Sequence, residues 1–429
     1  MTEKTGRKWP WWSKLLVFCV VAILATVVGW KVFESTLRSE CRAVAEAALA
    51  AAGPPRATGD GAQLDRWLAL MGPLEALGDA IGVPIVSSSY EDELPPDGSP
   101  PPAETVTNTT RLLESQVELL QTVNELIDGL PLIYPTTNDA DDLEFRFVDV
   151  RGSVLSFLHL QLFRARWTGD RDAVNDITRR LIQLRLLRPD RESWFEAMTA
   201  FGTDFDITES LQVALPELEA ETIDLVMQAL SEVPVSLPDA WRGERVSAAR
   251  NLLDCLEHIP SEDLIFLEIS GPLGEIRYFR AHLQMLRFIE AMLPRLDTWT
   301  EIDLQALRTE FQPATLSRWL DLEYPMGMGP VEVGISLLES AQRHRRKVLT
   351  TLVALELRRE RLRRGSLPSG LEELTLKLPP WLHSPGDDLG LTLWPVRGGM
   401  VVSSTSDRPP EDWGLLECYE EPGWFPVPE

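Results

Sequence analysis

The sequence predicts a mainly α-helical protein: an N-terminal transmembrane helix, a helical body of about ten helices and a small C-terminal α+β cap with a β-hairpin. Three observations predict this fold class. A charge-free apolar run fills residues 15–30, apolar residues recur at helical spacing from residue 105 almost to the end, and strand-forming residues gather at 391–404.

The composition indicates a folded and strongly acidic protein. The chain has 429 residues, of which 44% are hydrophobic and 25% are charged, so one large or two ordinary domains can form a core. The net charge is −25, although residues 1–33 are basic, with five Lys or Arg and one acid. Beyond residue 33 the chain holds 36 bases and 65 acids, a net charge of −29. This field excludes nucleic acid as a partner for most of the surface.

The first 33 residues predict a membrane anchor. Residues 1–14 form a short basic segment, and residues 15–33 carry one charge, Lys31. A helix of these 19 residues spans about 28 Å, which matches the hydrocarbon thickness of a bilayer. Four tryptophans flank the apolar run, where their rings favour the headgroup region: Trp9, Trp11, Trp12 and Trp30. We therefore expect a transmembrane helix over 15–33.

The alternative is a cleaved signal peptide, but the sequence favours an uncleaved signal-anchor. A signal peptide has an apolar core of about 7–15 residues that ends at a small-x-small cleavage site. Here Trp30, Lys31 and Phe33 follow the core instead. Four basic residues precede it and should stay in the cytoplasm: Lys4, Arg7, Lys8 and Lys14. This predicts a single-pass protein of the inner (cytoplasmic) membrane, with the N-terminus inside and the bulk on the extracytoplasmic, periplasmic side.

Residues 34–82 predict a helical stalk that leads into a linker. The alanine-rich stretch 36–52 continues the membrane helix, and a second short helix covers 62–81 with a break near Pro73. Residues 83–104 contain six prolines, which predicts an extended, Pro-rich linker.

Residues 105–330 predict an α-helical domain. Its first part carries an apolar stripe that predicts one long helix from Thr105 to Gly129: Val106, Leu113, Val117, Leu120, Val123 and Ile127. Further helices are expected at 142–168, 171–188, 193–201, 216–232, 238–258, 273–293, 299–309 and 313–322. Three pairs have capping-box spacing: Ser193 with Glu196, Thr298 with Glu301, and Ser369 with Glu372.

Residues 331–429 predict a long basic helix, followed by an α+β tail. The helix covers 331–365. Residues 391–396 and 400–404 read as two strands of a hairpin across Arg397-Gly398-Gly399, and strand signals are confined to this region. The stretch 408–429 is expected to pack as irregular coil.

The basic helix offers a candidate face for an anionic partner. Between residues 343 and 364 nine bases oppose two acids. The candidate residues are Arg343, Arg346, Lys347, Arg358, Arg361 and Arg364. The other interpretation, which we favour, pairs these side chains with the protein's own excess carboxylates.

No catalytic, cofactor-binding or metal-binding signature is present in the sequence. The G-x-S-x-G, P-loop, H-E-x-x-H and C-x-x-C motifs are absent, and no two histidines lie three or four residues apart. We predict no cofactor, and no small-molecule substrate is identified. His159, between two leucines, is expected to be a satisfied core residue. A single bridge between Cys255 and Cys418 is one arrangement that the four cysteines leave open.

The C-terminal region resembles the major pseudopilins of type II secretion. The helix 353–365 is followed by Gly365-Ser366-Leu367-Pro368, then Leu371 and Leu374, and the hairpin ends in 401–407. The chain is more similar to an uncharacterised family of single-span bacterial proteins that carry this tail after a helical region with a G-E-R segment, here Gly243-Glu244-Arg245. The pseudopilin peptidase site is replaced by Trp12-Ser13-Lys14, so the resemblance implies shared ancestry without calcium ligands or pilus assembly.

For function, the sequence favours a non-enzymatic, membrane-anchored extracytoplasmic scaffold that binds a protein partner. Two alternatives stay open. One is an accessory component of a secretion or pilus-like export system, which the tail suggests. The other is an envelope hydrolase with an acidic site built from distant residues. A deep pocket lined by carboxylates and a histidine would favour the hydrolase.

Overall fold

The computed structural model describes most of the chain. The described residues are 11–52, 56–81, 103–135, 141–257, 272–311, 330–375, 377–382, 391–404, 409–410 and 424–428. Several sequence predictions fall outside them: most of the basic segment 1–14, nearly all of the linker 83–104, the helix at 313–322, and Cys418 with its pairing to Cys255.

The described residues form two compact units, and each unit is built from separate stretches of chain. Unit 1 comprises Met1–Ala52, Arg245–Met292 and Arg308–Val333, and unit 2 comprises Gly53–Glu244, Leu293–Leu307 and Gly334–Glu429. The domain boundaries predicted from the sequence stay predictions. The fold class is confirmed, because the described chain is mainly helical with one long apolar N-terminal helix and a small C-terminal antiparallel sheet.

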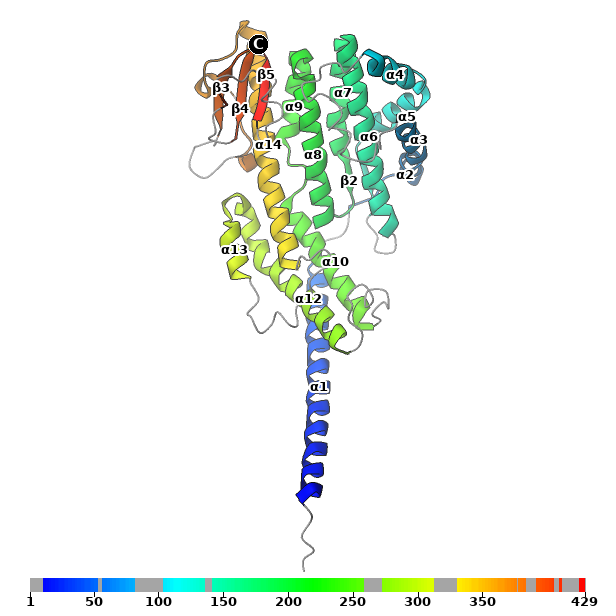
Figure 1. Ribbon diagram of the computed structural model, residues 1–429, viewed down its shortest axis with the longest axis vertical. Helices are drawn as coiled ribbons and strands as arrows, with labels where there is room; N and C mark the ends of the chain where they lie inside the picture. Colours follow the sequence, from blue (N-terminus) through cyan, green and yellow to red (C-terminus); the bar gives the residue numbers. More distant parts are fainter. Residues whose placement is uncertain are drawn as a thin grey trace, which may run out of the picture. The chain divides into compact units, whose positions relative to one another are not determined.

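The N-terminal helix of unit 1, α1 (Trp11–Ala50), runs without interruption through the predicted membrane span and the first part of the predicted stalk (Figure 1). Every described side chain from residue 18 to 29 is exposed. Further along, one face becomes buried at helical spacing: Leu37, Cys41, Ala45 and Ala48. This face packs on α12 (Pro272–Met292). The helix thus changes from exposed on all sides to buried on one side.

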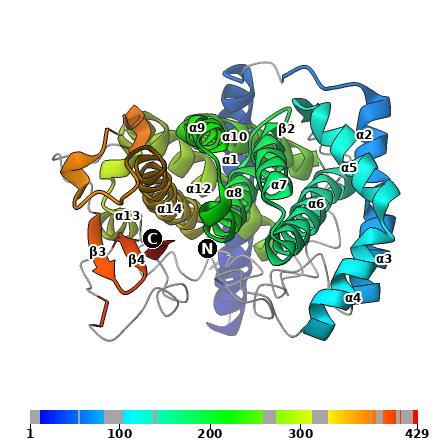
Figure 2. The ribbon, with the colours of Figure 1, turned by 90° about the horizontal axis from the view of Figure 1, so that it is seen from above.

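Unit 2 is a stack of helices around one hydrophobic core. Its helices are α2 (Gly61–Leu68), α3 (Met71–Ile81), α4 (Ala103–Glu114), α5 (Val117–Asp128), α6 (Asp141–Thr168), α7 (Arg171–Gln183), α8 (Trp194–Ala214), α9 (Ala220–Ser231) and most of α14 (Pro330–Arg364). Helices α6 to α9 pack side by side, and α2, α3 and α4 pack on α6 (Figures 1 and 2). Two other helices contain residues of both units: α10 (Leu237–Glu257) and α13 (Leu304–Glu310).

The long helix predicted from Thr105 to Gly129 is interrupted, so that prediction is wrong. The Ser115 hydroxyl donates to the Leu112 carbonyl at 2.6 Å, and Gln116 has φ −107° and ψ 29°, which lies outside the helical range. A serine hydroxyl that bonds to the backbone competes with the helical hydrogen bonds. Two helices, α4 and α5, result, and Val117 of the expected apolar stripe is 61% exposed.

A two-stranded parallel sheet lies within the helical body, contrary to the prediction that strands are confined to the C-terminal region. Strand β1 (Leu132–Tyr134) pairs with β2 (Leu187–Pro189). Each strand has three residues, too few to show an alternating pattern. The helix predicted over 171–188 accordingly ends early, at α7 and a short 3₁₀ turn, Leu184–Leu186.

The C-terminal cap is a three-stranded antiparallel sheet. The predicted hairpin is confirmed as β3 (Thr392–Val396) and β4 (Gly399–Ser403), with Gly398 at φ +96° in the turn. A third strand, β5 (Trp424–Pro428), pairs with the other side of β4, so the coil predicted there is wrong for these residues. β5 contains two prolines, which lack a donor N–H, and an edge strand tolerates them.

Two of the three predicted capping boxes are wrong. Thr298 lies at a kink inside the 3₁₀ segment Leu293–Glu301, and Asp303 caps α13 by accepting from the backbone N–H groups at 305 and 306. Aspartate is at least as good an N-cap as threonine, and it lies directly before the helix. Ser369 hydrogen-bonds through its backbone N–H to Glu373, at 3.3 Å, rather than to Glu372.

Candidate polar pocket at the start of α8

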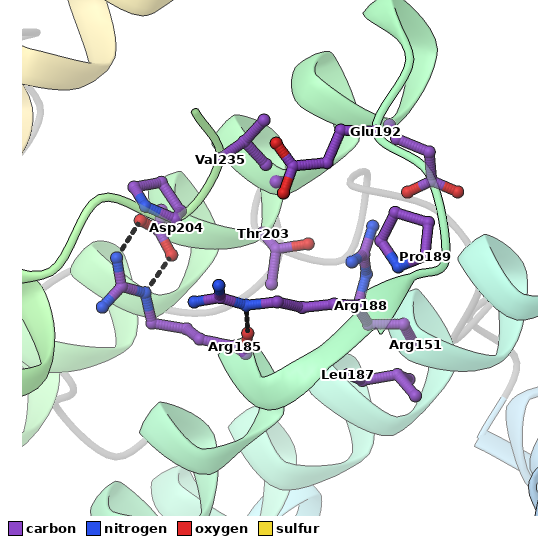
Figure 3. Close-up of a pocket in the computed structure, with 12 residues that line it drawn as sticks. Arg151, Arg185, Leu187, Arg188, Pro189, Glu192, Thr203, Asp204 and Val235 are labelled. Carbon is purple, nitrogen blue, oxygen red and sulfur yellow. Dashed lines mark hydrogen bonds and ion pairs between the residues drawn. The ribbon is translucent and has the colours of Figure 1, made fainter. Parts of the chain in front are cut away.

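A pocket lined largely by charged residues lies in unit 2, where the first turns of α8 face β2 and α6 (Figure 3). It is a small depression: the empty space in and directly above it amounts to about 370 Å³, and that figure includes open solvent. Six of its lining residues are charged: Arg151, Arg185, Arg188, Glu192, Glu196 and Asp204. A buried charge is costly unless it is paired or hydrogen-bonded, so the partners of each group decide what the pocket can bind.

Segment 243–244 of α10 packs against the chain that begins α8. Ser193 is the N-cap, and its hydroxyl accepts from the Glu196 backbone N–H at 3.1 Å, as one half of the predicted capping box requires. A Cβ atom on Gly243 would overlap the Glu192 carbonyl oxygen, so only glycine allows this approach. Glu244 accepts a hydrogen bond from the Trp194 N–H at 3.2 Å, and burial raises the pKa of Glu244 to about 7.

Asp204 neutralises Arg185 and orients His344. Its two carboxylate oxygens accept from Arg185 Nε at 2.8 Å and Nη2 at 3.1 Å, and His344 Nε2 lies 2.8 Å from Oδ2. Burial raises the pKa of Asp204, but Arg185 and His344 more than compensate, and the pKa lies below its ordinary value. The His344 ring stacks on Phe201 and Trp381, with centroids 4.8 and 6.0 Å away. The charges of this network are satisfied within the protein.

Glu192 is also satisfied on both carboxylate oxygens. Oε1 accepts from Arg56 Nη2 at 2.8 Å, and Oε2 accepts from the Ser236 backbone N–H at 3.1 Å. Burial raises the pKa of Glu192, and the neighbouring Arg56 reduces that rise without cancelling it.

Glu196 and Arg151 differ from these groups, because they are buried without such partners. Glu196 is 1% exposed and Arg151 is 4% exposed. Among the described residues, no hydrogen bond of normal geometry reaches either Glu196 oxygen or Arg151 Nη2. Burial raises the pKa of Glu196, and the charge of Arg151 and the Tyr134 hydroxyl lower it by less, so the pKa lies above its ordinary value.

Arg188 extends across the pocket from β2 (Figure 3). Its Nε donates to the Arg185 carbonyl at 3.3 Å, which fixes the direction of the side chain. Within the described part of the chain, its remaining guanidinium nitrogens make no hydrogen bond or ion pair. The pocket therefore presents two guanidinium groups with unused donors, those of Arg151 and Arg188, beside the Glu196 carboxyl group.

Four of the six residues of the candidate basic face contact the protein itself. The contacts are Arg358 with the Pro216 carbonyl (2.7 Å), Arg361 with the Pro428 carbonyl (3.0 Å), Arg364 with Glu360 and Glu373 (2.6 and 3.0 Å), and Lys347 with Glu209 (4.0 Å). Arg343 and Arg346 are exposed and make no ion pair with any described residue. The anionic-partner face stays a prediction, and these two residues are its exposed members without an ion pair to a described residue.

His159 is hydrogen-bonded within the core. Its Nδ1 lies 2.7 Å from the Ser210 hydroxyl, which itself donates to the Asp206 carbonyl at 2.9 Å. The hydroxyl proton is thus committed, and Nδ1 carries the hydrogen of the first bond. Burial lowers the pKa of His159 to about 4, so the ring is neutral at physiological pH.

Some of the pocket residues recur at helical spacing in the sequence, but the helix predicted there was too short to include all of them. Glu192, Glu196, Ala200 and Asp204 recur every four residues, so they follow one side of α8 and of the turn before it. The helix was predicted over 193–201 and thus ended before Asp204. Arg151 and Arg188 come from other elements, α6 and β2, and only the packing of these elements brings the two side chains to the pocket.

No group of His, Cys, Asp and Glu that could hold a metal ion occurs among the described residues. Comparison with family models, with curated proteins and with solved structures finds no match for this chain. The resemblance of the C-terminal region to major pseudopilins, and to the related single-span family, stays a prediction. The envelope-hydrolase alternative also stays a prediction. The pocket holds three carboxylates, and the protein's own arginines already neutralise two of them, Glu192 and Asp204.

Proposed function

We propose that this protein is a membrane-anchored, extracytoplasmic helical protein that binds other proteins. The observation that carries the proposal is the two-part burial of α1. Twelve Val, Leu, Ile and Phe residues lie within 15–33, and together they favour membrane insertion by about 4–7 kcal/mol. The described side chains at 18–29 face outward on all sides, and among them Phe18 is 69% and Ile23 is 62% exposed. Such a surface fits lipid rather than water.

The polar residues that follow mark the end of the span. Lys31 pairs with Glu34 at 2.9 Å, and Arg38 pairs with Glu34 at 3.3 Å. Arg38 also donates to the Leu256 carbonyl at 3.1 Å and lies over the Phe279 ring. Because α1 is one continuous helix, the proposed membrane span and the rest of unit 1 are joined without a flexible connection. The basic residues before the span support a cytoplasmic N-terminus and an extracytoplasmic bulk.

Membrane anchoring is tested by Ile23→Arg. An arginine near the centre of the span removes about 3 kcal/mol of the free energy that favours insertion, so carbonate should extract a larger fraction of the variant than of the wild type. The matched control is Ala43→Arg, an exposed position further along the same helix, which should stay in the membrane. A wild-type chain that carbonate extracts would contradict the anchor. A C-terminal reporter that is active only in the cytoplasm would contradict the orientation.

Partner binding is tested by crosslinking the full chain in native membranes. Arg343→Glu with Arg346→Glu reverses two exposed residues of this face that make no ion pair with a described residue, whereas reversal of Arg358 and Arg361 would break hydrogen bonds to the Pro216 and Pro428 carbonyls. The expected result is loss of specific crosslinks. The control Arg42→Glu with Arg111→Glu makes the same charge change at other exposed positions. If both double variants keep the wild-type crosslinks, this face does not bind the partner.

A further inference from the structure

The pocket at the start of α8 is lined by two arginines, one buried and one half-buried, whose donors are not all used by the described residues. Arg151 Nη2 is enclosed without an acceptor among the described residues, and the guanidinium of Arg188 is held in place only through its Nε. Buried polar groups almost always have a hydrogen-bond partner, because the loss of hydration is otherwise uncompensated. Both side chains line one small space that is open to solvent on part of its boundary. Such a space is suited to an acceptor that comes from outside.

We propose that this pocket binds the carboxylate group of a ligand, held by the guanidinium groups of Arg151 and Arg188. A guanidinium presents its donors in a planar fork that matches the two oxygens of a carboxylate. The two other arginines near this wall are already committed, Arg185 to Asp204 and Arg56 to Glu192. Among the described arginines that line the pocket, Arg151 and Arg188 are the two that have no ion pair.

The pocket favours a carboxylate over a phosphate. Glu192 and Glu196 line the same space, and their negative charge would oppose a ligand of charge near −2 more strongly than one of charge −1. Glu196 faces Arg151 from α6, Tyr134 from β1, and the nearby acids Asp190 and Glu192. In its protonated form it would donate a hydrogen bond to the ligand, and in its ionised form it would repel it. Its raised pKa supports the protonated form in the complex.

The proposal is tested by calorimetric titration of acetate into the full chain, reconstituted in nanodiscs. Arg151→Gln and Arg188→Gln should each weaken acetate binding about tenfold, the loss expected for one charge-assisted hydrogen bond. The matched control is Arg164→Gln, which lies on the same helix α6 but pairs with Glu114 at 3.1 Å and does not line the pocket. Circular dichroism and thermal unfolding identify a variant that fails to fold. Arg188 is half-buried, so its variant remains informative if Arg151→Gln unfolds.

Glu196→Gln distinguishes this arrangement from adventitious anion binding. The amide cannot ionise, so it should bind acetate several-fold more tightly than wild type at neutral pH, because the repulsion is removed. Inorganic phosphate, titrated in parallel, should bind more weakly than acetate. Absence of acetate binding, unchanged binding in both arginine variants, or tighter binding of phosphate would each overturn the proposal.

A separate competition experiment identifies which kind of molecule supplies the carboxylate. A short peptide with a free C-terminus and the same peptide with an amidated C-terminus compete with acetate for the wild-type pocket. Competition by the free form only would identify a polypeptide C-terminus as an acceptable ligand. If neither form competes while acetate binds, the pocket takes free small carboxylates. Both results support a carboxylate site, and equal competition by both forms would contradict carboxylate recognition.

Discussion

At the residue scale, Gly243 and Glu244 determine how α8 and α10 meet. Gly243 lies against the Glu192 backbone, and the adjacent Glu244 accepts from the backbone N–H of Trp194. Trp194 and Trp241 also contact edge to face, with centroids 4.8 Å apart. The contact thus combines close backbone approach, a helix cap and aromatic packing within a few residues. Each can be removed separately.

The close approach at Gly243 is tested by Gly243→Ala. The added methyl group would overlap backbone atoms that cannot move aside, so the variant should lose about 1–3 kcal/mol of unfolding free energy or more. The matched control is Gly202→Ala in α8, where a Cβ meets nothing within 4 Å and the better helix former should gain up to about 1 kcal/mol. Denaturant unfolding of the solubilised chain measures both. Equal effects from the two substitutions would contradict the close approach.

The buried Glu244 carboxyl group predicts a pH dependence of stability. Its pKa is about 7 in the folded protein against an ordinary value of 4.5, so the folded state binds this proton more tightly than the unfolded state. The stabilisation is complete below pH 4.5 and is lost as pH rises through 7. Glu244→Gln removes the ionisation and keeps an acceptor for Trp194. The variant should match wild type near pH 4 and exceed it at pH 8 by up to about 3 kcal/mol.

Unfolding titrations at several pH values measure this difference. The exposed Glu221→Gln in α9 serves as the control and should leave the pH profile unchanged. A Glu244→Gln profile parallel to that of wild type from pH 5 to 8 would show that Glu244 does not titrate in this range.

At the element scale, the C-terminal strand β5 completes the cap. Phe425 and Val427 are fully buried and join the core of unit 2, while the prolines at 426 and 428 remain on the edge strand. The central strand β4 is paired on both sides for this reason. Without β5, its backbone groups would form an open edge, which promotes association between sheets.

Phe425→Ala tests the contribution of β5. Removal of a fully buried phenylalanine side chain should cost about 3–5 kcal/mol of unfolding free energy. Leu362→Ala on α14 removes an apolar side chain that is 45% exposed, and it should change stability by less than about 1 kcal/mol. Chemical denaturation compares the two variants. A Phe425→Ala variant as stable as wild type would mean that β5 does not pack on the core.

At the scale of the whole molecule, charge is divided between the first 33 residues and the rest. The chain is basic up to residue 33 and carries −29 beyond it, while most arginines of α14 contact carboxylates or carbonyls of the protein itself. The internal use of basic side chains leaves the acidic groups to set the long-range field.

This field predicts weak association with polyanions. The full chain in nanodiscs of zwitterionic lipid should bind neither duplex DNA nor anionic vesicles at physiological ionic strength, because the excess carboxylates repel phosphate groups. Fluorescence anisotropy and vesicle flotation measure the two interactions, with a basic protein of similar size as the positive control. Saturable binding to either polyanion would contradict the prediction.

Local patterns were sufficient to predict elements whose residues interact with near neighbours. The apolar run of α1, the turn at Gly398 and the Ser193 cap each depend on contacts within a few positions along the chain. Prediction failed at two local features, the break after Ser115 and the Asp303 cap, and it failed where distant segments decide the conformation. β1 and β2 are strands only because they pair with each other, 55 positions apart, and β5 is a strand because β4 offers it an edge.

The sequence alone therefore determined the fold class, an N-terminal helix long and apolar enough to cross a membrane, and the separation of basic and acidic regions. These follow from composition and from spacing along the chain. Only the tertiary structure decided which charged side chains are neutralised inside the protein and which arginines keep donors without an acceptor. Arg151 and Arg188 come from different elements, and their meeting beside Glu196 depends on packing, because burial and pairing are properties of positions in space rather than of neighbours in the chain.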